Sequence, residues 1–258
     1  MNWGVLLERL RHFRKSNIAP VDTMGIEAIA SMNPQVPRKV KKAKLSAEEK
    51  GIKDFHTLVG LMLSSQTNDK ITSSTVYALI EDNGLTPKSV MKLSEKRLKE
   101  LIGKVGFFNR KTEYLKKVSS IILEKYGGSP PDTYENLIAL PGVGNKMAHL
   151  FLQVCHNKVE GISVDVHLHR IAHRWKWVDA NCSTPDKTAL GLQRWLPKKH
   201  WREINPLVVG FGQLMCTAQA PKCDICPLAD LCPSVRKSTS HRMNKTVPIK
   251  KDRESSEK

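Results

Sequence analysis

The sequence has no uninterrupted apolar run of about 18 residues, the length that a membrane-spanning helix requires. Acidic residues are also scarce, because 25 Asp and Glu stand against 42 Lys and Arg, which gives a formal net charge of +17. Charge of that size opposes compaction and indicates a polyanionic partner. Nucleic acid is the first candidate and an anionic membrane surface the second.

Strand-like alternation is missing as well, so the periodicity predicts an all-α protein. A first helix is expected to bury Val5, Leu6 and Leu10, although an Arg-rich mitochondrial presequence is the alternative reading of this segment. Ser46 and Glu49 form a capping box ahead of the next helix. Further helices are predicted over 55–65, 71–80, 98–105, 114–126, 137–138 (capped by Asp132), 146–156, 166–175, 186–196 and 201–215.

Two segments are unlike the rest of the chain. Residues 32–45 hold two prolines and five basic residues without an acid, which is typical of a linker. Residues 234–258 are charged and poor in apolar side chains, so they are expected to be disordered.

The segment LPGVGNK (140–146) lies between two helical patterns. Gly142 and Gly144 permit positive φ and close approach of a ligand, and free N–H groups at the start of the following helix suit a phosphate. Lys146 at that helix start either pairs with a phosphate or acts as an amine nucleophile. The macrodipole and nearby cations would lower its pKa and so supply free amine.

Asp165 precedes another predicted helix, in SVDVHLHR (163–170). It can cap that helix and also serve as a fixed carboxylate beside a cationic sugar. His167 and His169 lie on different helix faces and are interpreted as structural.

Four cysteines follow the spacing C-x6-C-x2-C-x5-C, at Cys216, Cys223, Cys226 and Cys232. Without a secretory signal the compartment is expected to be reducing, so the cluster indicates a metal site over disulfides. Zinc and an iron–sulfur cluster both accept four thiolates, and the spacing alone does not choose between them.

These motifs, together with LSSQTND (63–69), VGFFNRK (105–111) and VGFGQLMC (209–216), resemble the endonuclease III family of helix–hairpin–helix DNA glycosylases, in its eukaryotic branch. The resemblance covers residues 55–233. It implies a two-lobed fold with a C-terminal [4Fe–4S] cluster loop: a six-helix domain at 46–160, and a cluster lobe at 161–233 against which the N-terminal helix (within 1–31) packs.

The resemblance also implies roles for single residues. Lys146 matches the nucleophilic lysine and Asp165 the catalytic aspartate. Gln66 matches the residue that fills the space of an extruded base, and Phe107 the wedge, with Phe108 as an alternative. Lys222, in the loop between the first two cysteines, is expected to touch phosphate. Val166 stands where the family often has Thr.

The implied activity is a bifunctional DNA N-glycosylase and AP lyase acting on oxidised pyrimidines in double-stranded DNA. The expected setting is base excision repair in the nucleus, with the mitochondrion open, as a monomer without membrane attachment and alongside downstream repair proteins. Two rivals are an adenine-mismatch glycosylase, which lacks the nucleophilic lysine, and a non-catalytic hairpin module with a structural zinc.

Overall fold

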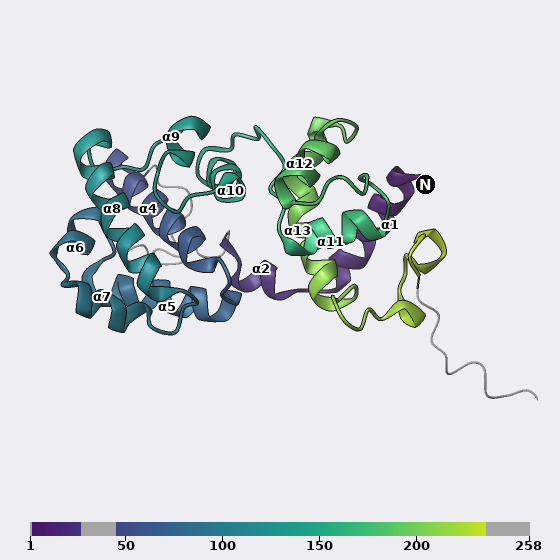
Figure 1. The fold of residues 1–258 in the computed structure, drawn as a ribbon, viewed down its shortest axis with the longest axis horizontal. Helices are drawn as coiled ribbons and strands as arrows, with labels where there is room; N and C mark the ends of the chain where they lie inside the picture. Colours follow the sequence, from purple (N-terminus) through teal and green to yellow (C-terminus); the bar gives the residue numbers. More distant parts are fainter. Residues whose placement is uncertain (1, 27–44, 236–258) are drawn as a thin grey trace, which may run out of the picture.

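The computed structural model describes residues 2–26 and 45–235, and every regular element within these ranges is a helix. The predicted all-α class is therefore confirmed. Figure 1 shows the helices in two lobes that lie side by side along the long axis. Most of the predicted linker (32–45) and tail (234–258) lies outside the described residues.

The first lobe surrounds a long central helix, α4, which is buried almost all round from Phe55 to Leu63. Within the described residues it contains seven helices. The helix that the sequence reading missed is α6, which begins at a capping box formed by Thr86 and Ser89. The bounds are α4 (Ala47–Ser64), α5 (Asp69–Asn83), α6 (Pro87–Lys92), α7 (Glu95–Ile102), α8 (Phe108–Tyr126), α9 (Tyr134–Ile138) and α10 (Asn145–His156).

Several helix ends follow local sequence signals. The predicted capping box is present at the start of α4, where Ser46 and Glu49 bond each other's backbone N–H groups. Gly127 ends α8 in the left-handed conformation. The predicted cap at Asp132 is wrong: α9 begins after Thr133, and Asp132 instead pairs with Lys158 at 3.0 Å.

The second lobe joins the two ends of the chain. Its α-helices are α1 (Trp3–Ser16), α11 (Val166–Arg174), α12 (Pro185–Gln193) and α13 (Trp201–Leu214), and short 3-10 turns complete it. Leu6, Leu7 and Leu10 of α1 are buried in the same core as Trp175 and Phe211. Val5, predicted to point inward, is 37% exposed because it lies on the outer side of α1.

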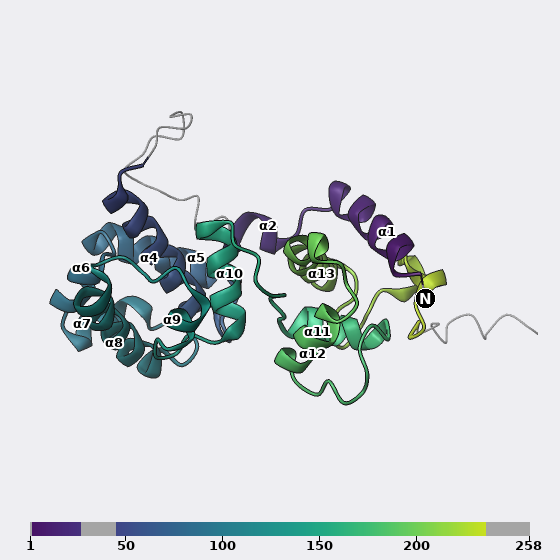
Figure 2. The same ribbon diagram turned by 90° about the horizontal axis from the view of Figure 1, so that it is seen from above.

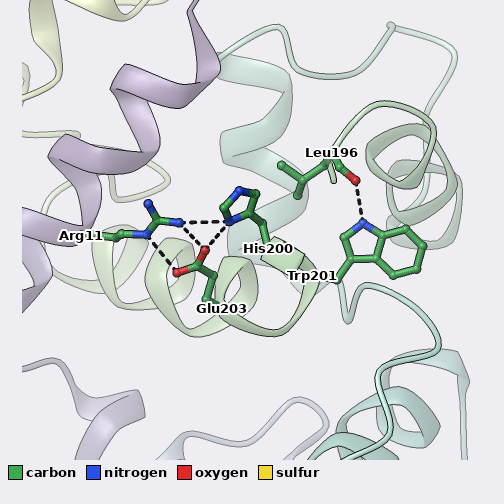
Figure 3. A network of polar contacts seen from close by, with 5 residues as sticks. All are labelled: Arg11, Leu196, His200, Trp201 and Glu203. Carbon is green, nitrogen blue, oxygen red and sulfur yellow. Dashed lines mark hydrogen bonds and ion pairs between the residues drawn. The ribbon is translucent and has the colours of Figure 1, made fainter. Parts of the chain in front are cut away.

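Polar contacts also fasten α1 to α13 (Figure 3). The Nε of Arg11 donates to Glu203 at 3.0 Å, and His200 contacts the same carboxylate at 2.6 Å. The hydrogen bond from Arg11 holds the pKa of Glu203 below its ordinary value, against the opposing effect of burial. Trp201 donates its indole N–H to the carbonyl of Leu196 at 2.8 Å and so anchors the start of α13.

The short helix α2 (Pro20–Met24) lies between the lobes (Figure 2). The side chain of Gln213 on α13 accepts from the backbone N–H of Val21 at 3.1 Å and donates to Asp69 of α5 at 3.3 Å. One amide therefore connects three helices from both lobes. No helix in the described ranges is both long and apolar enough to cross a membrane.

Candidate functional site

The hairpin between α9 and α10 has one glycine that no other residue can replace without strain. Gly142 has φ +81°, and an added Cβ would lie 2.4 Å from Cδ2 of Tyr114. Gly144 differs from the prediction, because its φ is −105° and nothing lies within 4 Å of its Cβ position. It is the N-cap of α10 and supplies no side-chain oxygen, so the first N–H groups of that helix remain open to a ligand.

A tyrosine that the sequence analysis did not single out supports the start of α10. Tyr134 donates its hydroxyl hydrogen to Oδ1 of Asn145 at 2.8 Å, and its ring stacks on His149 at 4.7 Å between centroids. Asn145 is the residue before Lys146. The contact therefore fixes the backbone from which the candidate nucleophile projects.

A chain of hydrogen bonds connects Lys146 with the segment that carries Asp165. Oγ of Ser163 donates to the backbone carbonyl of Lys146 at 3.5 Å, and the carbonyl of Ser163 accepts from Nδ2 of Asn205 at 2.6 Å. Ser163 and Asn205 are both buried. The loop before α11 is thus held between α10 of one lobe and α13 of the other.

Asp165 is the N-cap of α11, and its Oδ1 accepts from the backbone N–H of Leu168 at 2.8 Å. The charges of Asp165 and Lys146 both act on His167. Burial lowers the pKa of that imidazole; Asp165 opposes the shift and Lys146 adds to it. Both candidate catalytic residues therefore lie within electrostatic range of His167, although 19 positions separate them in the sequence.

The two residues expected to enter DNA share an unusual backbone. Gln66 has φ +52° and Phe107 has φ +58°, and both side chains are exposed. Phe107 is 64% exposed, whereas Phe108 packs against the core of the first lobe. Phe107 is therefore the more exposed of the two phenylalanines.

Sequence reasoning missed the role of Lys111, whose side chain is 5% exposed. Its Nζ donates to the carbonyls of Leu63 at 2.8 Å and Ser65 at 2.5 Å. Burial lowers the pKa of Lys111 to about 8. This lysine is nevertheless no rival to Lys146 as a nucleophile, because its nitrogen is enclosed and its hydrogens are engaged.

The four cysteines line one cavity together with Trp175, Phe211 and Met215. Among the described residues, no three His, Cys, Asp or Glu side chains are grouped as ligands of a single metal ion. Four thiolates around one cavity suit either zinc or an iron–sulfur cluster. Burial raises the pKa of Cys226 and Cys232, so a bound metal centre would be needed to hold them as thiolates.

Two arginines from α11 face the same cluster loop. Arg174 donates to Sγ of Cys216 at 3.1 Å and to the carbonyl of Thr217 at 2.7 Å, and Arg170 donates to the carbonyl of Cys216 at 2.8 Å. These positive charges offset the negative charge of thiolate ligands. Lys222 is exposed in this loop.

The sequence matches two known families. Residues 59–198 match the HhH-GPD superfamily of base excision DNA repair proteins. Residues 216–232 match the iron-sulfur binding domain of endonuclease III, which confirms the prediction of an iron–sulfur cluster over zinc. The fold and the site thus define a helix–hairpin–helix protein of base excision DNA repair with an iron–sulfur domain.

Comparison with individual relatives identifies the family within this class. The chain is 42% identical over 238 residues to endonuclease III-like protein 1 of Gallus gallus, covering 92% of this chain and 79% of that protein. It is 41% identical over 261 residues to the chloroplastic endonuclease III homolog 1 of Arabidopsis thaliana, covering 99% and 64%. The chain belongs to the endonuclease III family.

A solved structure agrees with this assignment. It is a trapped endonuclease III–DNA covalent intermediate, with a TM-score of 0.65 and 26% identity over 81% of this chain and 92% of that one. The chain spans about two thirds of the plant relative and four fifths of the chicken relative.

Proposed function

We propose that this protein is a bifunctional DNA N-glycosylase and AP lyase that removes oxidised pyrimidines from double-stranded DNA. The observation that carries the proposal is the link from Lys146 through Ser163 to the segment of Asp165. It joins the backbone of Lys146 to the segment that carries the Asp165 carboxylate, which supports a joint role for the two side chains. The covalent DNA intermediate named for the similar solved structure supports a covalent reaction.

DNA binding comes before the chemistry. The basic surface and the exposed N–H groups at the start of α10 hold the phosphate backbone. Extrusion of the damaged nucleotide costs a few kcal/mol, and Gln66 and Phe107 fill the space that it leaves. Lys222 contacts phosphate from the cluster loop, and Cys216, Cys223, Cys226 and Cys232 would hold an iron–sulfur cluster that keeps the loop in shape.

The reaction then proceeds on the sugar. Neutral Lys146 attacks C1′, and the bond between C1′ and the base breaks, with the electron pair leaving on the base. Asp165 stabilises the positive charge that develops on the sugar and accepts the proton that the amine loses. Ring opening gives an imine between Nζ and C1′. Loss of a C2′ proton then expels the 3′ phosphate by β-elimination, and water releases Lys146.

Borohydride trapping tests this mechanism directly. The wild type should form a reduced cross-link with DNA that carries an oxidised pyrimidine, whereas Lys146→Gln should form none. Lys158→Gln is the matched control, because Lys158 follows the other end of α10 and its ammonium bonds Asp132, carboxylate and carbonyl, at the surface. A cross-link that persists in Lys146→Gln would remove Lys146 as the nucleophile.

A second variant separates the two roles of Asp165. Asn caps a helix as well as Asp does, so Asp165→Asn should keep the bond to Leu168 and change the melting temperature little. The charge is lost, so trapping should slow by about 100-fold, as for other charge-stabilising groups. An unchanged trapping rate would reduce Asp165 to a cap.

The remaining expectations concern the cell. Three further points stay predictions: action in the nucleus with a share in the mitochondrion, a monomeric state, and contact with downstream repair proteins. A panel of lesion-containing duplexes in the trapping assay would identify the preferred damaged base.

A further inference from the structure

Gln66 and Phe107 are two exposed tips of the first lobe, and the backbone of each is strained. Five non-glycine residues in the described ranges have positive φ, and Gln66 and Phe107 are two of them. A left-handed conformation costs a side-chain-bearing residue about 1–2 kcal/mol. Such strain persists only where the surroundings force it. Some contact must therefore hold both tips.

The tips touch each other through their backbones. An added Cβ on Gly106 would lie 2.5 Å from the carbonyl oxygen of Gln66, so only glycine allows this approach. The backbone N–H of Gly106 donates to Oγ1 of Thr67 at 3.1 Å. The loop after α4 and the loop before α8 are thus in direct contact, although about 40 residues of chain lie between them.

Lys111 stabilises the contact between these two loops through further hydrogen bonds. Its backbone N–H donates to the carbonyl of Phe107 at 3.1 Å. Its ammonium donates to Leu63 and Ser65, as described, and to Oγ1 of Thr67 at 3.4 Å. An ammonium has three hydrogens and no acceptor, so these three oxygens use all of them.

The cost of this arrangement points to a purpose beyond packing. The residue is 5% exposed and faces no carboxylate among the described residues, where its charge is buried against backbone and hydroxyl oxygens. Burial of a charge without an opposite charge is costly, and an apolar residue would fill the space more cheaply. The contact that the charge secures is the one between the two tips.

We propose that Lys111 is a positioning residue that locks Gln66 and Phe107 into one rigid element, so that both enter the DNA together at a damaged base. This inference rests on the proposed function, because only there do the two tips act on DNA. Lys111 itself touches neither the DNA nor the reacting sugar. Its effect is on the extrusion step and not on the chemistry at Lys146.

The first experiment uses the free protein and needs no DNA. Lys111→Met keeps the length of the side chain and removes the ammonium. The control is Lys117→Met, an exposed lysine on the same helix. Amide hydrogen exchange should rise about tenfold or more over both 63–67 and 105–108 in Lys111→Met, and in neither segment in the control. Exchange that rises in one segment alone, or in none, overturns the proposal.

The second experiment separates extrusion from chemistry. Fluorescence of 2-aminopurine placed opposite the lesion reports extrusion in duplex DNA. Borohydride trapping on an abasic site in a single strand reports chemistry without extrusion. In Lys111→Met, extrusion should slow by about tenfold or more, whereas single-strand trapping should stay within about threefold of the wild type.

The outcomes are distinct from those of the proposed function. If the wild type never traps, the lyase proposal fails, and the exchange result still decides whether Lys111 holds the tips. Unchanged extrusion in Lys111→Met, or an equal loss of extrusion and single-strand trapping, overturns the positioning role. Should Lys111→Met not fold, Thr67→Val removes the acceptor for Gly106 and Lys111, and the same measurements on it decide the matter.

Discussion

Asn205 offers the sharpest test of how the site is held together. Its side chain is 7% exposed on α13, and Nδ2 donates to the carbonyl of Ser163 at 2.6 Å. Ser163 lies two residues before Asp165, and Asn205→Leu fills the same space without the donor. The change leaves a buried carbonyl without a partner, which costs about 1–3 kcal/mol. For a chain of this size, that lowers the melting temperature by roughly 2–12 °C.

The effect on activity should exceed the effect on binding. A displacement of about 1 Å at a reacting group costs on the order of 100-fold in rate. Single-turnover trapping on abasic DNA should therefore slow by about 10- to 100-fold, while the Kd for the same DNA stays within about threefold. Calorimetry and quenched-flow trapping measure the two quantities.

Ser163→Ala keeps the carbonyl and removes the 3.5 Å bond to Lys146, so it isolates the other contact of Ser163. It should cost less than about 1 kcal/mol of stability. The reasoning about Asn205 is refuted if Asn205→Leu melts and reacts like the wild type.

Three other predictions follow from single contacts. Gly142→Ala should destabilise the protein by about 2 kcal/mol or more, because of φ +81° and the clash with Tyr114. Gly144→Ala should cost about 1 kcal/mol. Urea unfolding compares the two variants, and equal losses of stability would contradict the hairpin geometry. Cys226→Ser should lose the brown colour, the bound iron and the soluble yield; full iron content would remove it from the ligands. Burial lowers the pKa of Lys111 to about 8, so the folded state releases the proton of Lys111 at a lower pH than the unfolded state does. Between about pH 8 and 10.5 the free energy of unfolding should therefore rise with pH, by at most about 3 kcal/mol. Lys111→Met should lack that rise, and an equal rise in both proteins would contradict the assignment.

Local signals in the sequence were sufficient for most of the helices. The capping box of Ser46 and Glu49 and the terminating Gly127 mark helix ends within a few residues, so sequence analysis places them well. The helix α6 escaped because it has six residues and too few apolar positions to show a period. Asp132 was misassigned because Lys158, 26 positions away, competes for its carboxylate.

For the candidate site, too, the sequence predicted some residues and not others. Motif spacing identified Lys146, Asp165 and the four cysteines. It did not identify Lys111, because the carbonyls that surround it lie 46 to 48 positions earlier in the chain. Tyr134 and Asn205 escaped for the same reason. Residues that support a site through contacts distant in sequence leave no local pattern.

The amide of Gln213 has a consequence for the mechanics of the molecule. Because it bonds α2, α5 and α13 at one point, it opposes separation of the two lobes there. If the lobes keep this arrangement on DNA, we expect the duplex to bend to fit them. Bending a site by 40–90° costs about 1–6 kcal/mol and less where stacking is already weak. Rigidity in the protein would then favour binding to damaged DNA, because damaged DNA bends more easily.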